Sequence, residues 1–403
     1  MRHHEAPETA GLETMKLLIF LGAGVSVPSH LPTAMELTDK LFSLPSLDDE
    51  ETRRIRGLLK LLREYDTADI GRVGLYQAGE GFRASGAIYR GGASTYEDLF
   101  YLCQQINLWC MGLSDNSQTT PFMESLERKA GELLNGASFD ARMNDLAKLG
   151  RPACSYIESV AAQTLRQEYV AGFDLLLELA LEPNIQELNI VTLNHDTLVE
   201  QFLSANEIDY VDGFGARDGD VRWSDDRVYE NTNTRVRLLK LHGSVNWYSL
   251  NHGNIPKTAM LLGNDLSCAR DASGSELKAE RLTPSFLSGL HKSVSYHRGF
   301  FADVHFRFLE LLRRCNRMIM SGYGWGDTAI NFQIETWIDS PRDNKVALLH
   351  TDPRQLSDRS VIMATSYEWW LRSGRLVAVE KWLADTSLSD LSGIPTWWQT
   401  DMQ

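Results

Sequence analysis

The sequence predicts an α/β fold, built on a Rossmann-like parallel sheet with a large helical insertion. Short apolar strands alternate with helical segments in the second half of the chain, the order that strand–helix–strand units give. A lone strand near the start is followed by the mostly helical stretch 34–185. Loops rich in Gly, Asn, His and Asp follow the strands. Such loops are typical of the edge of an open parallel sheet where ligands bind.

The composition is that of a globular protein. The 403 residues are 43% hydrophobic and 23% charged, and 40 basic against 54 acidic side chains give a net charge of −14. This mix excludes a largely disordered chain and a fibre. The acidic balance argues against direct binding to nucleic acid, which needs clustered Lys and Arg.

Neither a membrane span nor a secretory signal is recognisable. No apolar run approaches the roughly 18–20 residues that cross a bilayer, and residues 1–15 lack the basic-then-apolar order of a signal peptide. The five cysteines, at positions 103, 110, 154, 268 and 315, form no CxxC pair and no Cys/His metal spacing. We therefore expect a cytoplasmic protein with reduced, mostly buried thiols and no zinc.

The first half of the chain is expected to be helical after one strand. Residues 1–15 resemble a loose tail, and 16–21 form a short buried strand that ends at Gly22. Ser94 and Glu97 have the spacing of a capping box before an apolar run of helical period. Further predicted segments are a long amphipathic helix over 154–181 and a glycine-rich loop over 71–92.

The second half is expected to alternate strands and helices. The predicted strands are Leu188–Thr192, Val236–Leu241, Met318–Ser321 and Val346–His350, with helical candidates over 195–206 and 327–338. The polar, Gly- and Asp-rich stretch 213–234 is expected to be a surface loop. From about 384 a tail carries Trp397 and Trp398, which either pack back onto the body or contact a partner.

The loop after the first strand begins Gly22-Ala23-Gly24-Val25-Ser26. Its glycines permit close backbone approach, and N–H groups at a helix start can hold a pyrophosphate. The full hydride-transfer fingerprint needs a third glycine where Val27 stands, so that interpretation is weak. A plain tight turn is the alternative.

Two later strand ends carry candidate catalytic groups. Asn194 can fix a ribose hydroxyl or a water, or it can cap the next helix in an Asx turn. Asp196 can likewise be a first-turn helix acid. His195 is expected to be a pocket wall or a packed residue rather than a base. His242, followed by Gly243, suits general base work near neutral pH, whereas a lone strand-end His is more often structural. The neighbouring loops favour the catalytic interpretation.

These motifs resemble the sirtuin fold. Gly22–Ser26, Thr192–Asp196 and Leu241–Ser244 look like its GAGxS, TxNxD and HG signatures in the same order. Ser321-Gly322-Tyr323 stands where that family's late strand-end loop meets the adenosine ribose. The resemblance covers about 16–33 and 187–353 and leaves the helical stretch outside it.

The departures from sirtuin deacylases are equally informative. The two CxxC pairs of their structural zinc are absent, Leu193 replaces the Gln before Asn194, and Ala34-Met35 stand near the place of their Phe-Arg pair. The pattern is similar to the zinc-less, sirtuin-like NAD hydrolases of bacterial anti-phage defence. That resemblance implies NAD as the substrate, a homo-oligomer, and a sensor or partner such as a HerA-type ATPase or an Argonaute-like protein.

The resemblance also implies roles for individual residues. Asn194 and His242 would be catalytic, Asn194 holding the ribose or a water and His242 accepting a proton. Asp196 would contact the carboxamide of nicotinamide. The residues expected to bind NAD are Gly22, Ala23, Gly24, Ser26, Thr192, Asp196, Ser321, Gly322 and Tyr323. The expected division is a tail over 1–15, an NAD-binding core over 16–33 and 186–383, a helical insertion domain over 34–185 and a tail over 384–403.

The sequence leaves two other functions open. An NAD-dependent protein deacylase would release nicotinamide only with an acyl-lysine peptide. A non-catalytic module that binds NAD or ADP-ribose would bind without turnover, although such a module has no need of the base His242.

Overall fold

The structure is a computed structural model. It describes residues 15–43, 49–68, 94–113, 120–135, 144–230, 232–253, 255–263, 265–287, 296–358 and 360–392. The expected tail over 1–15 lies outside them except for Met15, as do the loop over 71–92 and the Trp397–Trp398 pair.

Seven parallel strands form the main sheet, in the order β11–β10–β9–β1–β2–β6–β3. The strands are β1 (Met15–Leu21), β2 (Ile185–Thr192), β3 (Tyr210–Val211), β6 (Val236–Lys240), β9 (Arg317–Ser321), β10 (Lys345–Leu349) and β11 (Leu376–Val379). Without the two-residue edge strand β3, this is the doubly wound Rossmann order, in which the chain reverses direction across the sheet beside β1. The predicted α/β class with a parallel sheet is confirmed, and each predicted strand is present within three residues of its expected start.

Helices cover both faces of this sheet because β1 is apolar on both sides. Leu17, Ile19 and Leu21 pack into one hydrophobic cluster, together with α8 (Asp174–Leu181) and α9 (Leu198–Ala205). Leu18 and Phe20 point the opposite way, as alternate residues of a strand do. They pack with α11 (Gly299–Arg314), α12 (Thr328–Ile338) and α13 (Val361–Arg372). All five residues are fully buried, so β1 lies at the centre of the molecule.

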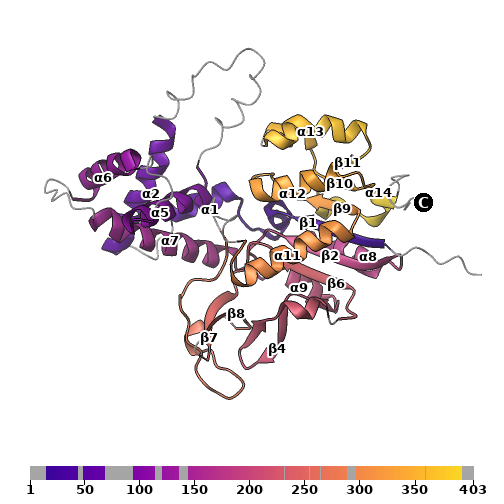
Figure 1. Ribbon diagram of the computed structural model, residues 1–403, viewed down its shortest axis with the longest axis horizontal. Coiled ribbons are helices and arrows are strands. Elements are labelled where there is room, and N and C mark those ends of the chain that lie inside the picture. The colour runs from indigo at the N-terminus through magenta and orange to yellow at the C-terminus, as the bar shows by residue number, and fades with distance from the viewer. Residues whose placement is uncertain are drawn as a thin grey trace, which may run out of the picture.

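Helices of the stretch between β1 and β2 gather beside the sheet (Figure 1). They are α1 (Ala34–Ser43), α2 (Glu50–Ala68), α5 (Tyr96–Cys110), α6 (Thr120–Asn135) and α7 (Asn144–Leu165). The capping box of α5 is formed by Thr95 and Asp98, one residue later than the predicted Ser94 and Glu97. The predicted helix over 154–181 is wrong in its continuity, since the chain leaves helical geometry between α7 and α8.

A second sheet of four antiparallel strands lies below the first in Figure 1. Its strands are β4 (Phe214–Asp218), β5 (Val221–Ser224), β7 (Trp247–His252) and β8 (Ile255–Leu261). The predicted surface loop over 213–234 is therefore wrong. Val221 and Trp223 alternate with polar residues and pack against Tyr248 and Leu250, the pattern of a strand buried on one face.

The remaining short elements are the 3-10 turns η1 (Ala23–Ser29), η4 (Asp226–Tyr229), η5 (Leu266–Cys268), η6 (Pro353–Asp358) and η7 (Leu383–Asp385), and the helix α14 (Leu388–Ser392). Among the described residues, no helix combines the length and the apolarity that crossing a membrane requires. Cys103, Cys154 and Cys315 are buried, and burial raises the pKa of the Cys154 and Cys315 thiols to about 12. Cys110 is half-buried and Cys268 is exposed.

Candidate active site

A cavity of about 220 Å³ lies at the carboxyl ends of β1, β2, β6 and β9. This is the point where the strand order reverses and where open α/β sheets bind ligands. The residues that line it are Gly22, Ala23, Ser26, Leu31, Pro32, Ala34, Leu37, Tyr96, Glu97, Leu165, Leu193, Asn194, His195, Asp196, His242, Gly322, Tyr323, Gly324, Gly326 and Asp327. The sheet and the helical stretch thus both contribute to its wall.

The loops after β1 and β9 touch backbone to backbone. A Cβ on Gly22 would lie 2.6 Å from the Gly322 carbonyl oxygen, and one on Gly322, whose φ is +67°, would lie 2.5 Å from the Val25 nitrogen. The Gly24 N–H donates to the Gly322 carbonyl at 2.9 Å. The GAG motif therefore serves close packing of two loops here, and Gly24 stands behind the cavity wall.

Asn194, Ser26 and Asp196 form one buried polar network. Asn194 Nδ2 donates to Ser26 Oγ at 2.9 Å and to the Gly22 carbonyl at 3.2 Å, and Ser26 Oγ donates to Asp196 Oδ2 at 2.8 Å. Asp196 Oδ1 also accepts from the Leu198 N–H at the start of α9, at 3.1 Å. Asp196 is not in the first turn of the helix, because α9 begins at Leu198. Its Oδ1 binds the first N–H of that helix, and its Oδ2 belongs to the polar network beside the cavity.

A buried lysine binds the backbone of this network. Lys240, the last residue of β6, pairs with Glu200 of α9 at 2.8 Å and donates to the Asp196 carbonyl oxygen. Both side chains are buried, and burial raises the pKa of the Glu200 carboxyl. The ion pair thus ties the Asp196 turn to the end of β6, two residues before His242.

His242 is held by two partners at one nitrogen. Its Nε2 lies 2.6 Å from Tyr296 Oη and 3.1 Å from Asp327 Oδ2, and Tyr296 Oη donates to that same carboxylate oxygen at 3.0 Å. Gly243 has φ +80°, and a Cβ there would lie 2.4 Å from the Ser285 carbonyl oxygen. The glycine of the HG pair lets the turn carrying His242 pack against this neighbouring segment.

Tyr323 lies on the β9 side of the cavity. Its hydroxyl donates to Asn331 Oδ1 at 2.6 Å, and burial raises its pKa well above the ordinary value of 10. Asp327 caps α12, because its Oδ1 accepts from the Ile330 N–H at 3.1 Å. The two residues are fixed by the same helix.

The predicted site residues divide between the cavity wall and the layer behind it. Those that line the cavity are Gly22, Ala23, Ser26, Asn194, Asp196, His242, Gly322 and Tyr323. Gly24, Thr192 and Ser321 are not part of the lining; Thr192 Oγ1 accepts from the Asn194 N–H at 3.0 Å, behind the wall. His195, expected to be a pocket wall or a packed residue, lines the cavity, and its ring lies 4.6 Å from that of Phe286.

Several residues at the site were not predicted from the sequence to belong to it. Tyr96 and Glu97 come from the start of α5, and Asp327 ends the run of polar residues after β9. Asp327 was predictable as a site residue, since it lies in a loop that follows a strand, as Asn194 and His242 do. Tyr296 has no sequence motif around it. The carboxylates of Glu97, Asp196 and Asp327 make the lining acidic, and the described lining residues include no Lys or Arg.

One family model matches the second half of the chain. The family model of the SIR2-like domain matches residues 188–369. No curated protein matches the chain. Among the described residues, no group of three or more His, Cys, Asp or Glu side chains could hold a metal ion.

Solved structures of Sir2 proteins share a weak likeness with the whole chain. A Sir2 homologue variant in complex with 2'-O-acetyl ADP ribose has 10% identity and a TM-score of 0.37, covering 97% of this chain and 96% of its own. Sir2 bound to acetylated peptide has 10% identity and a TM-score of 0.36, with coverages of 93% and 90%. A complex of Sir2 with p53 peptide and NAD+ has 11% identity and a TM-score of 0.33, with coverages of 90% and 95%.

Proposed function

We propose that the protein is an NAD+ glycohydrolase that releases nicotinamide and leaves ADP-ribose. The observation that carries the proposal is the gathering of Asn194, Asp196 and His242 around one cavity at the switch point of the doubly wound sheet. The match of residues 188–369 to the SIR2-like domain supports NAD+ as the substrate class.

The reaction exchanges one bond at the ribose for another. The C1'–N bond to nicotinamide breaks and its electron pair returns to the pyridine ring, so the leaving group departs neutral. A water oxygen then bonds to C1', and the water loses a proton to His242. Before water attacks, the ribose has the oxocarbenium character also met in glycosidases. We assign to Asn194 the placing of the ribose or the water, and to Asp196 the carboxamide of nicotinamide.

The acidic lining suits this substrate. Nicotinamide in NAD+ is a cation, and the ribose becomes one as the bond breaks. Three carboxylates, from Glu97, Asp196 and Asp327, favour such charges through their field. A cavity of about 220 Å³ is below the roughly 300–1,000 Å³ common for ligand sites. We therefore infer that it takes the nicotinamide–ribose half, with the pyrophosphate toward the Gly22–Ala23 turn and the adenosine toward Gly322 and Tyr323.

Hydrolysis is preferred to deacylation for two reasons. The sequence has no CxxC pair for the zinc of sirtuin deacylases. Residues of the helical stretch, among them Leu37, Tyr96 and Glu97, form one side of the cavity, so the sheet and the helices surround a small pocket. A water molecule fits in this pocket, whereas an acyl-lysine peptide needs an extended cleft that opens onto it.

A free NAD+ hydrolase would deplete its cell, so its activity requires control. We propose that the protein acts in the cytoplasm in defence against phage, as a homo-oligomer or with a sensor partner such as a HerA-type ATPase. The unpaired cysteines fit a reducing compartment. The charge of −14 makes direct contact with nucleic acid unfavourable. Any nucleic acid that triggers the activity would therefore be bound by a partner.

The test is incubation with NAD+, alone and with the proteins encoded beside it, following nicotinamide and ADP-ribose by chromatography. His242→Ala should lower nicotinamide release about 100-fold or more, the order of effect of a positioned acid–base group. Asn194→Ala should lower it about 100-fold, the order of effect of a misplaced reactant. Undiminished release in both variants would overturn the assignment. Release that depends on an acyl-lysine peptide would identify a deacylase, and tight binding without turnover would identify a regulatory module.

A further inference from the structure

Three buried polar groups meet beside the cavity, and two of them, His242 and Asp327, line it. His242 Nε2, Tyr296 Oη and Asp327 Oδ2 lie 2.6, 3.0 and 3.1 Å from one another. The His242 and Tyr296 residues are each 3% exposed, and the Asp327 side chain is 7% exposed. Hydrogen bonds between such buried groups are strong, because little water competes for them.

The protons of this triangle can be assigned from its chemistry. Burial and the adjacent Asp327 charge raise the pKa of Tyr296 well above its ordinary value. Its hydroxyl therefore stays protonated and donates a hydrogen bond to Asp327. The hydroxyl oxygen then accepts a hydrogen bond. His242 Nε2 is its partner at 2.6 Å, and this arrangement places a proton on Nε2.

Both partners of His242 are themselves fixed. The Tyr296 ring stacks on His305 of α11, with centroids 4.4 Å apart and planes 9° from parallel. Burial lowers the pKa of His305 to about 4, so this stacking ring is neutral at neutral pH. Asp327 is held at the start of α12, where its second oxygen caps the helix. Two helices thus set the position of the triangle.

We propose that Tyr296 and Asp327 are positioning residues, which fix the His242 ring and stabilise the charge that it gains on accepting a proton. This inference rests on the proposed function, because a positioned base matters only if the reaction occurs. A carboxylate in contact with an imidazole favours the protonated ring. Tyr296 holds the ring plane, and Asp327 supplies the charge.

Other titratable groups surround His242 and enter the interpretation of any pH effect. His195 has its ring 6.1 Å away, at the end of β2. His305 of α11 lies near enough for the charge of a protonated His242 to lower its pKa. Glu97 of α5 and Asp196 line the same cavity. A variant that alters only Asp327 leaves all four in place, so the difference from the wild type isolates its charge.

The first readout needs no enzymatic activity. NMR of the intact protein with labelled histidine follows each ring against pH, and His242→Gln identifies the His242 signal. Asp327→Asn keeps a helix cap but removes the charge. We expect it to lower the pH midpoint of the His242 ring by about one unit or more. An unchanged midpoint would overturn the proposal, whether or not the protein turns over NAD+.

The second readout is turnover of NAD+. Asp327→Asn and Tyr296→Phe should each lower kcat at least about tenfold with little change in KM, because they act through the base. Tyr229→Phe, which removes a buried hydroxyl bonded to the Leu238 carbonyl, and Asp265→Asn, at the exposed cap of η5, are matched controls that should retain full activity. Full kcat in both test variants would contradict the inference. A wild type without turnover but with the shifted midpoint would refute the proposed function and leave the positioning intact.

Discussion

Buried polar residues beside the cavity depend on one another for their partners. Ser26 accepts a hydrogen bond from Asn194 and donates one to Asp196. Lys240 donates to the backbone carbonyl of Asp196. Each of these side chains would be costly to bury alone. Loss of one therefore acts on its neighbours, and the site geometry depends on residues such as Lys240 that do not line the cavity.

The Lys240–Glu200 ion pair gives a prediction for stability. Lys240→Met leaves the Glu200 carboxylate buried without its partner, and we expect a loss of about 3–5 kcal/mol in the free energy of unfolding. Adding Glu200→Leu should restore most of it, since the uncompensated charge is then gone. Urea unfolding measures both, and Arg54→Met, in an exposed pair with Glu50, should cost less than about 1 kcal/mol. A double variant no more stable than Lys240→Met would refute this account.

At the scale of elements, the loops after β1 and β9 meet so closely that a side chain on Gly322 has no room. Gly322→Ala should destabilise the protein by about 3 kcal/mol or more, because it adds a clash with the backbone of Val25 to the cost of a positive φ. Gly374 is the matched control: its φ is +70° but nothing lies within 4 Å of its would-be Cβ. Gly374→Ala should therefore cost only about 1–2 kcal/mol. Equal losses in urea unfolding would show that the close approach is unimportant.

Elements with a strong local pattern were predictable from sequence, and elements defined by distant contacts were not. The β1 strand carries five consecutive apolar residues, Leu17–Leu21, and a glycine follows it, so its bounds differ from the prediction by one residue. β5 is short and half polar, and it reads as a strand only once Tyr248 and Leu250 cover it. The α5 cap moved by one residue because Thr95 and Asp98 have the same spacing as the predicted pair.

The same distinction applies to the candidate site. Asn194, Asp196 and His242 follow strands, so parallel topology alone brings them to one edge. Tyr296 reaches His242 across 54 residues of sequence, from a segment without periodicity. Its position depends on the stacking with His305, a contact between separate parts of the chain that a linear pattern does not encode.

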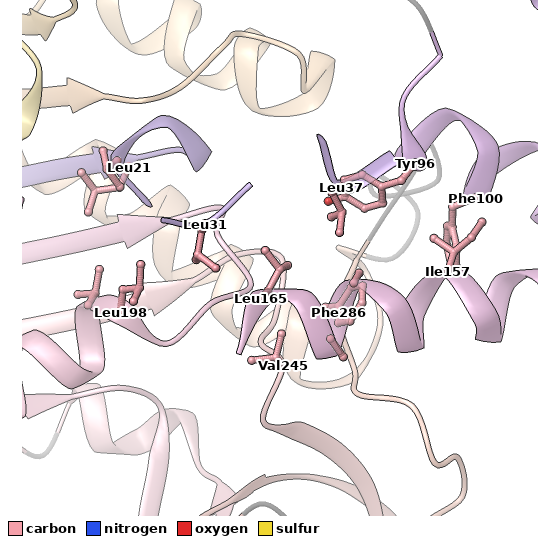
Figure 2. Close-up of a cluster of buried hydrophobic side chains, with 14 of the residues drawn as sticks. Leu21, Leu31, Leu37, Tyr96, Phe100, Ile157, Leu165, Leu198, Val245 and Phe286 are labelled. Carbon is pink, nitrogen blue, oxygen red and sulfur yellow. The ribbon is translucent and has the colours of Figure 1, made fainter. Parts of the chain in front are cut away.

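At the scale of the whole molecule, one hydrophobic cluster joins the helical stretch to the sheet. Figure 2 shows it running from Leu21 and Leu198 at the sheet, past Leu165, to Phe100 and Ile157 among the helices. Several of its members also line the cavity, namely Leu31, Leu37, Tyr96 and Leu165. The packing that connects the two parts is thus the packing that forms one side of the cavity, so movement of the helices would alter the pocket.

This shared cluster predicts that the helical stretch and the sheet unfold together. Because Leu165 of α7 packs in the cluster that also contains Leu198 of α9, separating the parts would expose apolar surface on both. Hydrogen exchange followed by mass spectrometry should therefore show α5 and α7 losing protection at the same urea concentration as β1 and β2. Leu165→Ala should lower the free energy of unfolding by about 2–5 kcal/mol. It should lower the urea concentration at which protection is lost by the same amount in the helices and in the strands.

Leu181→Ala is the control for that variant. Leu181 ends α8 and is 61% exposed, so its truncation should change stability by less than about 0.5 kcal/mol. If the helices lose protection well before the strands, or if Leu165→Ala destabilises the helices alone, the two parts are separate folding units. The helical stretch would then be able to move against the sheet without unfolding it, and activation of the site would be a change in docking. If they lose protection together, the cavity belongs to one cooperative core. Opening the cavity would then require a rearrangement of the hydrophobic cluster itself.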